Sequence, residues 1–322
     1  MADPATPARS PLDHRLGGWP ALLVAAALLA LPAAAQALGG EFYISLATRV
    51  LVFALAATSL NLVLGFGGMV SFGHAAFIGL GAYAAAVTMQ AGVTSAWVAW
   101  PVAMAVAALA ALVIGAISLR TQGVYFIMIT LAFAQMLYYL MVSLKTYGGD
   151  DGLSLAGRSR VGPGWDLADA TRFYYTVLAC AALGFLGVWR LLNARFGHTL
   201  QAIRENETRM GAIGFATTRF KLVAFVIAGA LAGLAGALLA NQGSFVSPSM
   251  MQWHQSGVLM MMVILGGVGH LWGGVIGAVV FLLLEEFLSH YTIHWQFGLG
   301  AILLAVVLVA PNGLTSLGRR KR

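Results

Sequence analysis

Residues 219–241 read RFKLVAFVIAGALAGLAGALLAN, and no charged side chain follows Lys221 within this stretch. A membrane span requires about 20 mainly apolar residues, folded as a helix so that the backbone satisfies its own hydrogen bonds in lipid. We expect a helix in this range and in nine others of the same character: 20–38, 44–64, 73–90, 96–119, 123–144, 173–193, 254–270, 273–289 and 295–310. The sequence therefore predicts an all-α, polytopic membrane helical bundle with about ten transmembrane helices, and the helix ends within 254–289 stay open.

The composition is that of a membrane protein throughout. Of the 322 residues, 60% are hydrophobic and 9% are charged, whereas soluble domains carry about 25% charged residues. No polar linker divides the chain, so we expect a single transmembrane domain over 1–322. The net charge is +7, but the only lysines are Lys145, Lys221 and Lys321, too few for a nucleic-acid-binding surface. Cys180 is the single cysteine, which excludes an intrachain disulfide and a cysteine-based metal site.

The distribution of arginine and lysine orients the predicted helices. If the N-terminal segment 1–19 is cytoplasmic, most basic residues fall on the inner side, in loop 194–218 and in the tail 311–322. Fewer fall on the outer side, where the longest loop is 145–172. This bias is typical of cytoplasmic loops, so we expect both termini in the cytoplasm and an even number of spans.

The first apolar segment has a second interpretation. Arg15 precedes it, and Ala35-Gln36-Ala37 near its end resembles the cleavage site of a signal peptide. Whether residues 20–38 are cleaved or retained therefore stays open, and either outcome leaves the later topology unchanged.

Two glycine-rich stretches interrupt the apolar pattern, GFGGMVSFGH at 65–74 and GGVGHLWGG at 266–274. Glycine disfavours an uninterrupted helix, and broken helices in membranes often lie at the substrate site of a transporter. We therefore expect the translocation pathway beside Gly65, Gly67, Gly68, Ser71, Phe72, Gly73, His74, Gly266, Gly267 and Gly269. The alternative is that these glycines only let helices pack closely. The shared GG and GH elements also leave an internal repeat open.

The inner loop contains the most polar helical stretch of the chain, AIRENETR at 202–209. Around it, one helical stripe is expected to hold Glu207 and the apolar residues Leu200, Ile203, Met210 and Ile213. The chain has no Gly-Lys pair and hence no Walker A loop for ATP, and no acid or base lies near the middle of a predicted span. Energy is therefore expected to enter from a cytoplasmic partner through this segment. The alternative is a solvated helix at the membrane surface.

One group of residues has metal-ligand chemistry. Glu286, His290 and His294 are spaced i, i+4, i+8, which places them on one face of a continuous helix. They lie where a helix is expected to leave the membrane, and no fourth ligand is evident. We therefore expect no metal site and no catalytic residue, and a membrane enzyme using these side chains is the most distant alternative.

Several of these stretches together resemble the LivM-type permeases of branched-chain amino acid ABC importers. The resemblance covers roughly 45–310 in the family's order and rests on Leu60-Asn61-Leu62, Ser71-Phe72-Gly73-His74-Ala75-Ala76-Phe77, Gly123-Val124-Tyr125-Phe126, Thr146 with Gly148-Gly149 and Gly152-Leu153, Ala202-Ile203-Arg204-Glu205-Asn206-Glu207, and Leu265-Gly266-Gly267-Val268-Gly269.

The resemblance implies a transport subunit, not an enzyme, in the bacterial inner membrane. It implies translocation of branched-chain or related amino acids, with no cofactor in this chain because ATP and Mg are bound by partner subunits. The implied partners are a second, LivH-like permease, two ABC ATPase subunits and a periplasmic substrate-binding protein, besides membrane lipid and without nucleic acid. The alternatives are a similar importer for urea or short amides, and a secondary carrier or channel without ATPases.

The resemblance also assigns two sets of residues. The coupling region for the ATPases is matched by Arg204, Glu205, Asn206, Glu207 and Gly211. This match to the EAA loop of ABC importers is loose, because its alanines are absent. The family's outer-loop motif is matched by Gly148, Gly149, Asp150, Asp151 and Gly152.

Overall fold

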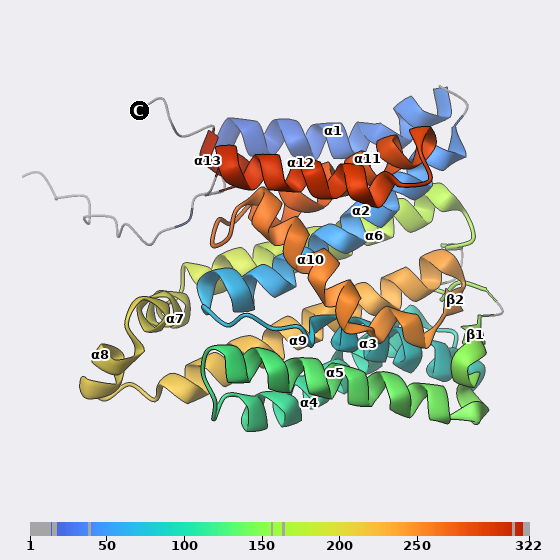
Figure 1. Ribbon diagram of the computed structural model, residues 1–322. Helices are drawn as coiled ribbons and strands as arrows, with labels where there is room; N and C mark the ends of the chain where they lie inside the picture. The colour runs from blue at the N-terminus through green and yellow to red at the C-terminus, as the bar shows by residue number, and fades with distance from the viewer. Residues whose placement is uncertain are drawn as a thin grey trace, which may run out of the picture.

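A computed structural model describes residue 14 and residues 18–37, 40–155, 157–162, 165–310 and 313–317. Most of the N-terminal segment 1–19 and of the tail 311–322 lies outside the described residues. The described chain is helical except for loops and a two-stranded ribbon, which confirms the predicted all-α class (Figure 1).

A helix occupies each of the ten ranges expected to be apolar helices. They are α1 Gly18–Ala37, α2 Glu41–Asn61, α3 His74–Gln90, α4 Ala96–Ser118, α5 Val124–Ser143, α6 Ala170–Leu192, α9 Thr217–Gly243, α10 Trp253–Gly266, α11 Gly273–Tyr291 and α12 Trp295–Val309. Among the described residues, six helices are long and apolar enough to cross a membrane: α2 with its continuation to Phe66, α4, α5, α6, α9 and α11. The chain is thus a multi-pass membrane protein. The apolar parts of α1, α10 and α12 are shorter, so the larger number of spans stays a prediction.

The long helices run side by side between two polar ends (Figure 1). At one end lie α7 (Arg195–Glu205) and α8 (Glu207–Ala212). At the opposite end, β1 (Leu153–Ser154) pairs antiparallel with β2 (Phe245–Val246). Loops 194–218 and 145–172 therefore lie at opposite ends of the bundle, as the alternating topology requires. Short helical turns complete the chain: η2 Lys145–Tyr147, η3 Gly149–Asp151, η4 Pro248–Met251 and α13 Leu314–Leu317.

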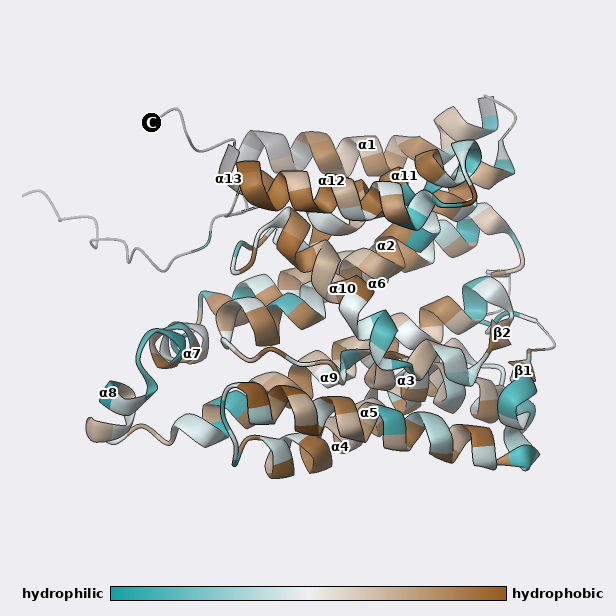
Figure 2. Cartoon of the chain, viewed as in Figure 1, coloured by the Kyte–Doolittle hydropathy of each residue, from teal (hydrophilic) through white to brown (hydrophobic). Residues whose placement is uncertain are grey.

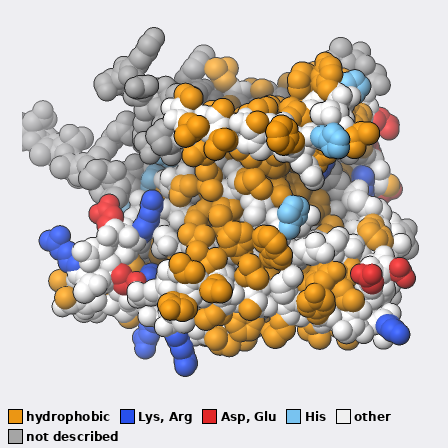
Figure 3. All heavy atoms as spheres, in the orientation of Figure 1, with side chains coloured by type: hydrophobic (Ala, Val, Ile, Leu, Met, Phe, Trp, Pro, Cys, Tyr) orange, Lys and Arg blue, Asp and Glu red, His pale blue; other side chains and the backbone are white. Residues whose placement is uncertain are grey.

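The surface between the two ends is apolar. Hydrophobic residues cover the lengths of the helices, while hydrophilic residues gather at α7, at α8 and near β1 (Figure 2). On the face seen in Figure 3, acidic and basic side chains likewise concentrate at the ends. Helices that cross a bilayer need an apolar surface along the hydrocarbon core, and their polar residues then lie at the two ends.

The interior is built around α2 and α9. In the most apolar window of each helix, 78% of residues are buried for α2 and 61% for α9, against 17% for α5. Small residues bring α9 close to α3 and α4: a methyl group at Gly233 would lie 2.5 Å from Ala107 Cβ, and one at Gly81 would lie 2.5 Å from Gly233 Cα. Such close approach of backbones is how helices associate where lipid removes the hydrophobic driving force.

Candidate functional site

The first glycine-rich stretch is a break between two helices inside the protein. After α2 the chain makes a π-helical turn, η1 (Leu62–Phe66), and stays irregular until α3 begins at His74. Two hydrogen bonds fasten the break to its neighbours: Phe72 N donates to Thr130 Oγ1 of α5 at 3.3 Å, and Ala75 N donates to Ser256 Oγ of α10 at 2.9 Å. Backbone that leaves a helix at membrane depth is tolerated because protein surrounds it.

The second stretch is mainly a tight hairpin between α10 and α11. A methyl group at Gly266 would overlap Gly273 O, and one at Gly277 would overlap Met262 O. A methyl group at Gly274 would lie 2.7 Å from Thr58 N of α2. For the glycines at the helix ends, the packing interpretation therefore accounts for the contacts. Gly267 and Gly269 have φ of 123° and 77°, which side chains other than glycine rarely adopt.

The two glycine-rich stretches touch each other through Asn61. This buried side chain donates from Nδ2 to His270 O at 2.8 Å and accepts from Gly269 N at 3.1 Å. The backbones also meet directly, since a methyl group at Gly65 would lie 2.5 Å from Gly269 N. The last turn of α2 and the α10–α11 hairpin therefore form one unit.

Arg204 at the end of α7 joins this unit. Its Nη1 donates to Gly65 O. Its side chain also fills the space beside two glycines, because a methyl group would lie 2.9 Å from Arg204 Cγ if placed on Gly68 and 2.7 Å from Arg204 Nη1 if placed on Gly269. Residues predicted separately for coupling and for the pathway thus lie together. We call Asn61, Gly65, Gly68, Arg204 and Gly269 the Arg204 cluster.

A polar cavity of about 290 Å³ adjoins the cluster at the same end of the bundle. Its lining includes Gly67, Gly68, Gln122, Glu207 and Lys221. Glu207 Oε2 lies 2.5 Å from Lys221 Nζ of α9, and the side chains are 29% and 14% exposed. Gln122 Nε2 also donates to Glu207 Oε2, at 3.4 Å. The carboxylate of Glu207 therefore has both an ionic and a hydrogen-bonding partner within this chain.

The continuous helical stripe expected across this segment is wrong. The backbone at Asn206 is extended, with φ −155° and ψ 95°, so α7 ends there and α8 begins. Asn206 Oδ1 accepts from Arg209 N at 2.8 Å, which is the capping bond that asparagine favours at a helix start. Leu200 and Ile203 consequently pack inward from α7, while Met210 lies on the separate helix α8.

The tip of this end is exposed and partly apolar. Glu205, Arg209 and Gly211 are exposed, and so are the apolar side chains Ile213 and Phe215, at 64% and 41%. Apolar side chains grouped at the polar end of a membrane protein are typical of a surface that a protein partner covers.

At the opposite end, the glycines of the outer-loop motif shape a turn. Gly148, Gly149 and Gly152 have φ of 87°, 52° and 81°, and a methyl group at Gly152 would overlap Val246 O. These glycines let the chain enter the β1–β2 ribbon. Asp150 and Asp151 are exposed beside them.

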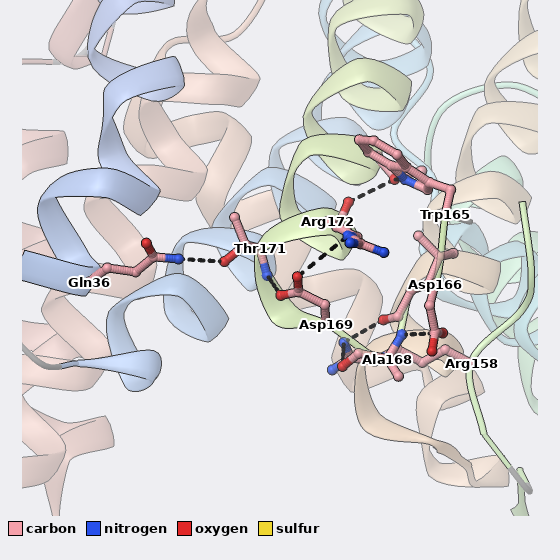
Figure 4. A network of polar contacts seen from close by, with 10 residues as sticks. Gln36, Arg158, Trp165, Asp166, Ala168, Asp169, Thr171 and Arg172 are labelled. Atoms are coloured by element: carbon pink, nitrogen blue, oxygen red, sulfur yellow. Dashed lines mark hydrogen bonds and ion pairs between the residues drawn. The ribbon is translucent and has the colours of Figure 1, made fainter.

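A polar network joins Arg158 to residues 165–172 of the loop before α6 (Figure 4). Arg158 Nη1 donates to Leu167 O at 2.9 Å, and its guanidinium lies 4.5 Å from the ring centroid of Phe173. Burial lowers the pKa of Arg158, and the nearby Asp169 carboxylate opposes that shift. Asp169 also caps α6 by accepting from Thr171 N at 2.9 Å. Nothing in the sequence pattern singled out these residues, because their partners are mostly backbone groups and a ring.

The histidines have structural partners or lie apart. His74 Nε2 lies 2.8 Å from Ser59 Oγ, and that hydroxyl donates to Ala56 O at 2.7 Å, so His74 Nε2 is the donor. The helix α11 ends at Tyr291, which interrupts the i, i+4, i+8 face carrying His290 and His294. Within the described residues, no group of three histidines, cysteines or acids is placed to hold a metal ion.

Comparison with known proteins identifies the family. The family model described as "Branched-chain amino acid transport system / permease component" matches residues 42–310. The chain is 29% identical over 299 residues to the high-affinity branched-chain amino acid transport system permease protein LivM of Salmonella typhimurium, covering 86% of this chain and 70% of the relative. It is 28% identical over 317 residues to LivM of Escherichia coli, with 91% and 74% covered.

A more distant similarity covers less of the chain. The xylose transport system permease protein XylH of Haemophilus influenzae is 31% identical over 147 residues, which is 43% of this chain and 39% of the relative. No solved structure matches. Because the family match extends over 42–310, from α2 to the end of α12, this chain belongs to the permease components of branched-chain amino acid transport systems.

Proposed function

We propose that this chain is the permease of an ATP-driven importer that moves branched-chain or related amino acids into the cytoplasm across a bacterial inner membrane. The observation that carries the proposal is the Arg204 cluster. Through this cluster, α7 contacts both the break that follows α2 and the α10–α11 hairpin. A displacement of α7 would therefore move the end of α2 and the α10–α11 hairpin together. The substrate class follows from the family and from the names of its LivM members.

The coupling surface for two ABC ATPase subunits is the end of α7, α8 and the turn after α8. Glu205, Arg209, Ile213 and Phe215 are exposed there and offer both charged and apolar contacts. Arg204 lies behind this surface and links it to the glycine-rich breaks. ATP and Mg are bound and hydrolysed on the ATPases, and both termini of this chain share their side of the membrane.

The translocation pathway runs beside the break at 65–74, between this chain and a second, LivH-like permease. Gly67 and Gly68 already border the polar cavity at the inner end. At the outer end, the exposed carboxylates of Asp150 and Asp151 form the contact for a periplasmic substrate-binding protein. On this proposal the ATPases and the binding protein contact opposite polar ends of the bundle (Figure 2).

The test introduces the same change, isoleucine to aspartate, at each of the two ends of the bundle. Ile213 is 64% exposed beside α8, and Ile293 is 93% exposed between α11 and α12. Ile213→Asp should abolish co-purification of the ATPases and uptake of labelled leucine, because a charge replaces an apolar contact. Ile293→Asp should leave both intact. Full uptake by the Ile213→Asp variant contradicts the coupling surface, and uptake of urea but not leucine contradicts the substrate class.

A further inference from the structure

A large apolar cavity lies away from the Arg204 cluster, between α1, α2 and α6. Its volume is about 770 Å³, within the range of about 300–1,000 Å³ found for small-molecule sites. Its walls are almost entirely aliphatic and aromatic, with α1 contributing Val24 and Leu28, α2 contributing Leu55, and α6 contributing Leu178, Ala182 and Leu186. A cavity with so few polar groups does not retain water, because water needs hydrogen-bonding partners.

The cavity persists because polar contacts hold α1 at a fixed distance. Pro32 has no N–H, so Leu28 O lacks its usual helical donor. Tyr174 OH of α6 supplies that donor at 2.8 Å. Ahead of α1 in the chain, Trp189 Nε1 donates to His14 O and His14 N donates to Asn193 Oδ1, both at 2.8 Å. These bonds hold Leu28 of α1, and His14 ahead of it, against α6.

The dimensions of the cavity match one leaflet of a bilayer. On α1 the lining runs from Gly18 to Leu29, twelve residues whose eleven steps rise about 16 Å. The hydrocarbon core is about 30 Å thick, so this is about the depth of one leaflet. Gly18 begins α1 near the end of the bundle that carries α7, and Trp272 and Val275 lie where α11 begins, so the cavity lies toward the leaflet on that side. Val24 and Leu29 on its wall are 46% and 57% exposed, so it opens sideways toward lipid.

A cation lies one helical turn beyond the cavity lining on α6. Arg190 follows the lining residue Leu186 by one helical turn and therefore lies on the same face of α6. Arg190 is exposed, and no acidic partner is found for it among the residues that the structure describes. Basic side chains at this depth attract anionic lipid headgroups.

We propose that this cavity binds one acyl chain of a phospholipid, with the headgroup phosphate beside Arg190. The lipid would complete the packing of α1 against α2 and α6, and this role is independent of the transported substrate.

The experiment measures phospholipid retained by the full chain after purification in a mild detergent, by native mass spectrometry and by lipid extraction. The double substitution Ala25→Phe and Ala182→Phe fills the cavity. The control Leu183→Phe enlarges a neighbouring side chain that is 70% exposed and does not line the cavity. We expect the wild type and the control to retain phospholipid. The filled variant should retain about tenfold less, which corresponds to a loss of about 1.4 kcal/mol in binding free energy. Arg190→Gln should reduce the share of phosphatidylglycerol in what is retained.

Equal retention by the filled variant overturns the proposal, and so does a wild-type cavity that holds only detergent. A second measurement decides the matter if the filled variant fails to fold. Phosphatidylglycerol with brominated acyl chains should quench the tryptophan fluorescence of the wild-type chain. Because Trp272 lines the cavity, Trp272→Phe should remove a slowly exchanging part of this quenching. Identical quenching in both proteins contradicts an acyl chain at this site.

Discussion

Gly65 and Gly211 both belong to the candidate site, but the space around them differs. A methyl group at Gly65 would lie 2.5 Å from Gly269 N and would overlap Asn61 Oδ1, whereas nothing lies within 4 Å of one at Gly211. Gly65→Ala should therefore lower the stability of the chain by about 1–3 kcal/mol through overpacking and impair uptake. Gly211→Ala should leave stability equal or slightly higher, because alanine favours helix. Thermal unfolding in detergent and leucine uptake check both, and an unaffected Gly65→Ala contradicts the cluster.

The Glu207–Lys221 pair gives a second prediction at the scale of single residues. Glu207→Ala strands the ammonium of Lys221, which is only 14% exposed, so this variant should be less stable and transport poorly. The exchange Glu207→Lys with Lys221→Glu should recover part of the loss, with a coupling energy of about 0.5–3 kcal/mol. Arg209→Ala, at an exposed position of α8, serves as the control for stability alone, because this side chain belongs to the proposed coupling surface. If the exchanged variant is no better than the single ones, Glu207 acts on a partner protein.

The sequence singled out the glycines and the arginine of the Arg204 cluster, but not the contacts that join them. The two glycine-rich stretches and the polar stretch 202–209 were visible as departures from an apolar pattern. However, Arg204 binds a backbone carbonyl 139 positions away, and a carbonyl group carries no sequence signal. Asn61 was missed as a bridge, although a polar amide at the end of an apolar helix indicates a buried partner.

At the scale of elements, the attachment of α1 to α6 depends on Pro32. Tyr174→Phe leaves Leu28 O without a donor, which should cost about 1–3 kcal/mol. Pro32→Ala restores a backbone N–H, so Tyr174→Phe should cost much less in that background. Tyr175→Phe is the matched control, because its acceptor, Leu29 O, keeps the helical donor at position 33.

Unfolding midpoints of the four combinations of Pro32→Ala and Tyr174→Phe measure this coupling. Additive effects would show that the hydroxyl of Tyr174 does not replace the missing helical hydrogen bond. The position of α1 would then rest on apolar packing alone.

Helix positions could be predicted because a bilayer imposes the same length and composition on every span. Each of the ten expected ranges holds a helix with ends only a few residues away. The split between α7 and α8 was missed because a stripe of apolar residues was followed across Asn206. Asparagine followed by an acid in the first turn is a helix-start signal, and weighing it would have placed the break. The π-helical turn at Leu62–Phe66 has no comparable signal.

At the scale of the whole molecule, the two polar ends should be reached by labels from opposite sides of the membrane. In a chain with Cys180→Ser, Arg209→Cys should react only with a reagent that enters the cytoplasm. Asp150→Cys should react with a membrane-impermeant reagent added outside. Both positions are exposed, so in cells that express this chain without its proposed partners, access depends on the side alone. Labelling of Arg209→Cys from outside contradicts the predicted orientation.

The bond between Asn61 and Gly269 also has a consequence for biosynthesis. The two residues are 208 positions apart, and ribosomes add about 5–20 residues per second, so about 10–40 s separate their synthesis. Throughout that interval α2 has already left the ribosome, yet the hairpin that will receive its amide does not exist. A nascent chain inserted span by span would hold this amide in lipid unpaired. The insertion machinery must therefore shelter α2 until the last sixth of the polypeptide is being made.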